Sequence, residues 1–194
     1  VTWGDPDAGG NSTTVSSKLS GGVTSIYSNE NAYVALKKDG SVVTWGDPDR
    51  GGNSTAVSSQ LSGNVTAIYP NESAFAALKK DGSVVTWGDP DVGGNSTAVS
   101  SQLSGNVTAI YSNWNAYAAL KKDGSVVTWG DPDAGGNSTA VSNQLSGNVT
   151  AIYSKWNAFA ALKKDGSVVT WGDPDAGGNS TAVSSQLSGN VTAI

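Results

Sequence analysis

The residues with the clearest chemical potential in this chain are paired carboxylates such as Asp89 and Asp91, which flank Pro90. Paired carboxylates serve as acid and base when their surroundings push the two pKa values apart inside a pocket. Here the same pair recurs loop after loop along the chain, which favours a structural role. Histidine and cysteine are absent, so imidazole bases, thiolate nucleophiles and the usual zinc ligands are missing. We therefore expect a protein that is not an enzyme.

The same loops place oxygen atoms at alternate positions ahead of a glycine pair, as calcium-binding loops often do. The candidate ligands in two of these loops are Asp47, Asp49, Asn53, Asp89, Asp91 and Asn95. The pattern lacks the bidentate glutamate of an EF-hand, and its alternative reading is a turn in which Asp side chains accept backbone amides. Calcium is therefore the one cofactor that the sequence leaves possible, and no metal site is firmly predicted.

Asparagine offers a third kind of chemistry, because Asn-x-Ser/Thr is the acceptor sequence for N-linked glycans. The candidate positions are Asn11, Asn53, Asn64, Asn71, Asn95, Asn106, Asn137, Asn148, Asn179 and Asn190. Duplication has copied two of these sequons several times, so the count overstates the evidence. We expect an asparagine that caps a helix to be less available than the Asn64 type, which precedes a strand. Covalent glycans would require passage through a secretory pathway.

One variable position reads Glu30, Glu72, Trp114 and Trp156 in successive copies of a loop. Trp114 and Trp156 could form an exposed aromatic row, a surface that stacks on sugars or contacts a neighbouring protein. The alternative is that each tryptophan covers the edge of its own sheet.

These residues all belong to a tandem repeat. Trp3, Trp45, Trp87, Trp129 and Trp171 follow one another at intervals of 42 residues. A single repeat array over 1-194 therefore divides into units 1-42, 43-84, 85-126, 127-168 and a partial unit 169-194.

Within one unit, β-branched, aromatic and alanine-rich runs predict strands at 65–69, 74–78 and 84–87. Asp81-Gly82 supplies the positive φ that a tight hairpin requires. A short helix over 97–103, capped by Asn95 or Ser96, or an irregular crossover would complete the unit. Neither face of the strands is clearly polar, so we expect both faces to be covered by neighbouring sheets.

The segment 107–136 resembles the repeat of the regulator of chromosome condensation family, through its AL..DG.V..WG pattern and the glycine-rich turn that follows. The resemblance implies a β-propeller fold, and it assigns no catalytic or exchange-factor residue to this chain. The sequence begins at a third strand and stops after a first strand, and no copy has the polar cap of a terminal repeat, so we favour instead an open, solenoid-like stack. We predict a mainly β tandem-repeat protein with three antiparallel strands per unit, and keep the closed propeller as the alternative.

Composition argues against nucleic-acid binding and against a membrane-spanning segment. Only 14% of residues are charged and the net charge is -5, so the basic surface of a nucleic-acid-binding protein is missing. No apolar run is long enough to span a bilayer. We expect an extracellular or cell-surface, N-glycosylated fibre or stalk that associates with further copies or belongs to a longer array. The alternative is a propeller-like binding module for a protein or glycan partner.

Overall fold

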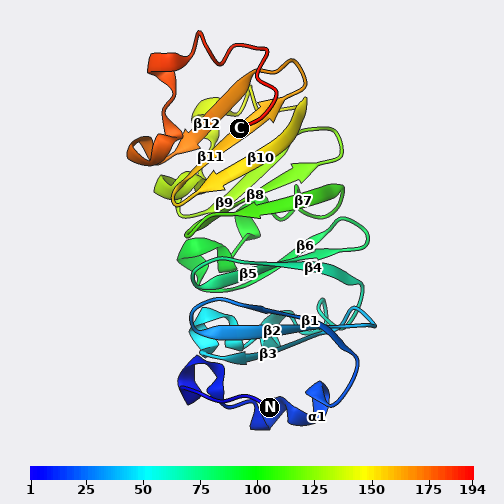
Figure 1. The fold of residues 1–194 in the computed structure, drawn as a ribbon. Helices are drawn as coiled ribbons and strands as arrows, with labels where there is room; N and C mark the ends of the chain where they lie inside the picture. Colours follow the sequence, from blue (N-terminus) through cyan, green and yellow to red (C-terminus); the bar gives the residue numbers. More distant parts are fainter.

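The computed structural model describes residues 1–194 as four three-stranded antiparallel sheets stacked one above another (Figure 1). The sheets are β1–β2–β3, β4–β5–β6, β7–β8–β9 and β10–β11–β12, each with its strands in sequence order. The strand bounds are β1 Val23–Ser28, β2 Ala32–Lys37, β3 Val42–Gly46, β4 Val65–Pro70, β5 Ala74–Lys79, β6 Val84–Gly88, β7 Val107–Ser112, β8 Ala116–Lys121, β9 Val126–Gly130, β10 Val149–Lys155, β11 Ala158–Lys163 and β12 Val168–Gly172. The stack stays open from the N-terminus to the C-terminus. The prediction of an open β-repeat array is therefore confirmed.

The hairpin between the second and third strands forms where Asp-Gly predicts it. In the second sheet Leu78 pairs with Val84, and Gly82 takes a φ of +78° in the turn between them. The Asp81 carboxylate accepts hydrogen bonds from the Ser83 hydroxyl (2.6 Å) and from the Ser83 backbone amide (2.9 Å). These two bonds stabilise the ionised carboxylate and lower the pKa of Asp81.

The segments before, between and after the sheets consist of tight turns with little regular helix. Each begins with a five-residue turn of π-helical hydrogen bonding: Pro6–Gly10, Pro48–Gly52, Pro90–Gly94, Pro132–Gly136 and Pro174–Gly178. A short 3₁₀ turn follows at Thr13–Val15, Thr55–Val57, Thr97–Val99, Thr139–Val141 and Thr181–Val183. The one α-helix, α1, covers Ser16–Leu19, and no helix is long and apolar enough to cross a membrane.

The helix predicted over 97–103 thus forms only as the 3₁₀ turn Thr97–Val99, and irregular turns complete the segment. Serine, threonine and valine are mediocre helix formers, and the isolated segment is too short for helix propagation to offset nucleation. Leu103 is nevertheless buried, because its backbone amide bonds back to Val99 and Ser100 and turns its side chain toward the sheet.

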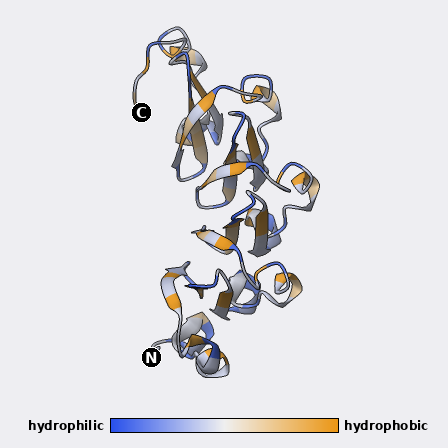
Figure 2. Cartoon of the chain, turned by 90° about the vertical axis from the view of Figure 1, so that its right-hand side faces the viewer, coloured by the Kyte–Doolittle hydropathy of each residue, from blue (hydrophilic) through white to orange (hydrophobic).

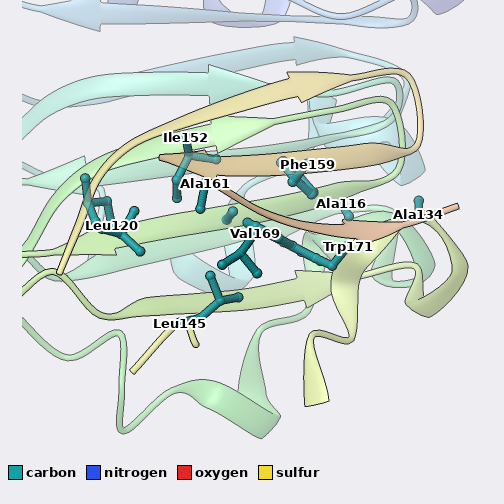
Figure 3. Close-up of a cluster of buried hydrophobic side chains, with 11 residues drawn as sticks. Ala116, Leu120, Ala134, Leu145, Ile152, Phe159, Ala161, Val169 and Trp171 are labelled. Carbon is teal, nitrogen blue, oxygen red and sulfur yellow. The ribbon is translucent and has the colours of Figure 1, made fainter. Parts of the chain in front are cut away.

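The core lies between the sheets, and both faces of the central strands are covered. On β5, Phe75 and Ala77 face the sheet below, whereas Ala74, Ala76 and Leu78 face the sheet above. Figure 3 shows the equivalent junction higher in the stack, where Ala116 and Leu120 of β8 meet Phe159, Ala161 and Trp171 of the next sheet. Hydrophobic segments recur at every level of the stack (Figure 2). Small alanines alternate with large aromatics, which lets successive sheets approach closely.

One contact repeats at all four junctions and joins each sheet to the turn before it. The indole N–H of Trp87 donates to the carbonyl oxygen of Gly51 at 3.0 Å, and the ring stacks on Phe75 with centroids 5.5 Å apart. The same bond joins Trp45 to Gly9, Trp129 to Gly93 and Trp171 to Gly135, at 3.0 to 3.1 Å. The repeating tryptophan therefore holds neighbouring units together.

Candidate functional site

The loops between the first and second strands of the four sheets lie along one side of the stack. Their tips carry Glu30, Glu72, Trp114 and Trp156, which we call the loop row. In the first three loops an asparagine fixes the turn, whereas the fourth loop has Lys155 at the equivalent position. Asn71, for example, accepts hydrogen bonds from the amides of Ser73 (3.2 Å) and Ala74 (2.7 Å). Its side-chain amide donates to the carbonyl oxygen of Val92 in the crossover turn that follows the same sheet (2.6 Å). The positions of the first three tips therefore depend on asparagine side-chain bonds at their base.

Backbone hydrogen bonds connect three of the four tips to each other. The Glu72 amide donates to the carbonyl oxygen of Trp114 (3.1 Å), and the Trp114 amide donates to that of Trp156 (2.9 Å). Ser112 adds a side-chain bond to the carbonyl oxygen of Pro70 (2.8 Å). Backbone ladders of this kind hold neighbouring segments about 4.8 Å apart. The three tips therefore form a regular ladder parallel to the stack.

The two tryptophans of the loop row are exposed and stacked on each other. Trp114 is 59% exposed and Trp156 is 65% exposed, and their rings lie 6.2 Å apart with 26° between their planes. The two rings thus lie exposed in a row, and neither is buried over its own sheet; that they contact a partner stays a prediction. Large exposed apolar groups that are held in place are typical of contact sites.

Polar groups surround this aromatic pair in a shallow groove of about 740 Å³. Lys155 places its ammonium 5.9 Å from the centre of the Trp156 ring, within the range of a cation–π interaction. The Asn115 amide, oriented with its nitrogen toward the loop row, donates to the Glu72 carboxylate (2.9 Å) and to the carbonyl oxygen of Trp114 (3.2 Å). The groove is lined by Ser28, Asn29, Glu30, Pro70, Asn71, Glu72, Ser112, Asn113, Trp114, Ser154, Lys155 and Trp156. Sequence reasoning missed Lys155 and Asn115, although both adjoin the variable position.

The carboxylates considered for calcium lie in the crossover turns, where the backbone amide of Asp89 donates to the carbonyl oxygen of Ser73, the residue after Glu72 (3.0 Å). Asp89 accepts a hydrogen bond from the amide of Asp91 (3.0 Å), and Asp47 accepts one from the amide of Asp49 (2.9 Å). Asn95 likewise accepts from the amide of Thr97 (3.0 Å). No three acidic side chains gather at one point. These side chains thus make the local hydrogen bonds of a turn, which was the alternative to a calcium-binding loop. Calcium binding stays a prediction.

The structure places the sequons in three different environments. Asn95 and its equivalents are exposed, and the side-chain oxygen of Asn95 accepts a hydrogen bond from the Thr97 hydroxyl of the same sequon (2.6 Å). Asn64 is exposed with a φ of +65°, but the hydroxyl of its Thr66 donates to the carbonyl oxygen of Leu78 in the sheet (3.1 Å). Asn71 is only 9% exposed and uses its side-chain amide and oxygen in internal bonds. Whether any sequon carries a glycan stays a prediction.

Neither a known family nor a curated protein matches the chain by sequence. Solved structures do resemble it: Prp20p from Saccharomyces cerevisiae is 18% identical over 77% of this chain, with a TM-score of 0.52. The same yeast protein in a complex with Kap60 is 16% identical over 77% of this chain, with a TM-score of 0.49. Human WBSCR16 is 18% identical over 77%, with a TM-score of 0.46.

The chain spans 44%, 42% and 47% of the matched chains in those three structures. At such low identity the likeness establishes fold alone. It agrees with the repeated three-stranded units described above, and with the resemblance found in the AL..DG.V..WG pattern. In fold, this chain is an open array of three-stranded repeats similar to those of Prp20p.

Proposed function

We propose that this protein is a repeat scaffold that binds a partner along the groove of its loop row. The observation that carries the proposal is the stacked pair of exposed tryptophans, Trp114 and Trp156, held by a backbone ladder inside a groove of about 740 Å³. Exposed aromatic rings in fixed positions supply large contact area at little cost in conformational entropy. The fold is compatible with this role, since the structure of Prp20p was described together with its binding to Gsp1p and histones.

Divergence between copies supports the same assignment. The strands barely change from unit to unit, whereas the tips of the loop row change from glutamate to tryptophan. A contact site on a repetitive scaffold needs particular copies to differ, because identical copies present identical surfaces. In the loop row, the residues that differ between copies line a groove.

Replacing Trp114 and Trp156 together by serine tests the proposal. The wild-type chain and the double variant are screened against arrays of immobilised peptides and glycans, and we expect binding to disappear in the variant. The matched control is Trp3→Ser, because Trp3 is 85% exposed and lies outside the loop row. Equal binding by the double variant and the wild type would contradict the proposal.

A second candidate function, a structural fibre or stalk, is favoured by the four equivalent junctions. Because each tryptophan–glycine bond is made by the same residues at 3.0 to 3.1 Å, the junction sets no fixed number of units. On this proposal the protein is extracellular, carries N-glycans and associates with further copies. The test measures native mass by analytical ultracentrifugation before and after enzymatic deglycosylation; a monomer of 19.5 kDa that the enzyme leaves unchanged would contradict it.

A further inference from the structure

The loop row contains one junction that occurs nowhere else along the stack. Its tips follow in the order Glu30, Glu72, Trp114, Trp156, so a carboxylate neighbours a tryptophan only between Glu72 and Trp114. The backbone bond from Glu72 to Trp114, at 3.1 Å, holds these two tips at ladder spacing. Trp156 stacks on Trp114 from the other direction along the row. Glu72 and Trp114 thus form a distinct pair within a repetitive surface.

The chemistry of this pair suits a planar cation. A guanidinium attracts a carboxylate through charge and hydrogen bonds, and it also stacks on an indole face. The chain itself provides an example of the second contact at the neighbouring tip, where the Lys155 ammonium lies 5.9 Å from the centre of the Trp156 ring. Asn115, whose amide donates to the Glu72 carboxylate at 2.9 Å, holds that carboxylate near Trp114.

The wider charge distribution points to the same class of partner. The groove contains two carboxylates, Glu30 and Glu72, against one ammonium, Lys155, and the chain as a whole has a net charge of -5. An acidic protein attracts basic segments over distances of about 10 Å at moderate salt. In an extended peptide, side chains on one face are about 7 Å apart, a wider spacing than the about 4.8 Å of the ladder, so successive basic side chains would not match successive tips one to one.

We propose that Glu72 and Trp114 bind an arginine side chain of a basic, extended polypeptide segment. The inference rests on the proposed function, and adds the class of partner and the residues that select it. In this arrangement the guanidinium stacks on the indole of Trp114 and donates hydrogen bonds to the carboxylate of Glu72. A second basic residue of the same segment lies toward Glu30.

The test uses dye-labelled Gly-Arg-Gly-Arg-Gly and the same peptide with citrulline, which keeps the shape of arginine but carries no charge. Fluorescence anisotropy is measured at low and high salt with the full chain. We expect the arginine peptide to bind and the citrulline peptide to bind much more weakly, with affinity falling as salt rises. Glu72→Gln and Trp114→Ser should each weaken binding about two- to fivefold, as expected for exposed ion pairs and cation–π contacts.

Glu30→Gln is the matched control, because it removes a carboxylate from the same row at a tip with no neighbouring tryptophan. We expect it to weaken binding less than Glu72→Gln does, while circular dichroism verifies that each variant folds. Equal binding of the citrulline peptide, or equal losses in the two glutamate variants, would overturn the inference. Binding of cellohexaose or chitohexaose through Trp114, with no binding of the arginine peptide, would overturn it while leaving the proposed function intact. Absence of any ligand for the loop row across peptide and glycan arrays would defeat both.

Discussion

The junction between successive units can be perturbed at Gly93, which packs under the aromatic pair of the next sheet. Gly93 has a φ of +108°, and a Cβ atom added there would lie 2.7 Å from the Tyr117 ring. Positive φ costs a residue with a side chain about 1 to 2 kcal/mol. The overpacked ring adds about 1 to 3 kcal/mol, because the close-packed interior has little room to move. We expect Gly93→Ala to lower the free energy of unfolding by about 2 to 5 kcal/mol.

Two other glycines separate these contributions. Gly177 has a φ of +99° but no atom within 4 Å of an added Cβ, so Gly177→Ala should show the backbone cost alone, about 1 to 2 kcal/mol. Gly105 has no positive φ and its added Cβ would come no closer than 3.7 Å to the Asp81 carbonyl oxygen. Gly105→Ala should be neutral or stabilise by up to about 1 kcal/mol, because alanine restricts the unfolded chain.

Equilibrium unfolding in urea, followed by tryptophan fluorescence, measures all three variants against the wild type. The expected order of stability is Gly105→Ala, then Gly177→Ala, then Gly93→Ala. A Gly93→Ala protein as stable as Gly105→Ala would refute the reasoning, since it would mean that successive sheets do not pack against the crossover turn as the structure shows.

Three further predictions follow from other contacts. Trp87→Phe removes the indole donor to the Gly51 carbonyl oxygen, so it should lower the free energy of unfolding in urea by about 1 to 3 kcal/mol. Trp3→Phe, at an 85% exposed site, should leave this free energy almost unchanged. Equal effects of the two substitutions would contradict the junction bond. Hydrogen bonds from Ser83 lower the pKa of Asp81 in the folded protein, so the carboxylate stabilises the fold above the unfolded pKa of 3.8, and this stabilisation is lost as pH falls through the folded pKa. Urea unfolding should therefore show Asp81→Asn less stable than wild type at pH 7, with the difference vanishing in acid. A difference that stays constant with pH would argue against the carboxylate bonds. In a eukaryotic secretory host, mass mapping of peptides should find glycans at Asn95 rather than at Asn71, because Asn71 is 9% exposed and bonded to Val92; occupancy at Asn71 in the folded protein would show that the loop forms differently.

The repeat and its strands could be predicted from the chain alone because their signals are local. β-branched and aromatic runs lead to strands β4, β5 and β6 within one or two residues, and Asp81-Gly82 marks the hairpin turn. The absence of a polar face on these strands predicted that sheets would cover each other, and Ala76 and Ala77 are both fully buried. The short helix was predicted less well, because serine and threonine can satisfy backbone groups in turns as readily as in helices.

The candidate site was visible in the sequence only as a variable position. Comparison of copies singled out Trp114 and Trp156, but it left open whether each ring covered its own sheet or faced solvent. That choice depends on how far one unit rotates and rises relative to the next, which no local pattern encodes. The ladder from Glu72 to Trp156 and the contributions of Asn115 and Lys155 depend on that geometry as well.

The sequence by itself determined the unit: its length, its strands, its turns and the residues that differ between copies. Only the tertiary structure decided the stack, because stacking joins residues of neighbouring units, such as Trp87 and Gly51, which are 36 residues apart, or Trp114 and Trp156, which are a full unit apart. Local propensities act over a few neighbours, whereas the packing of alanines against aromatics between sheets sets the relation of one unit to the next. The groove of the loop row is a product of that relation, and so it appears only when the units are assembled.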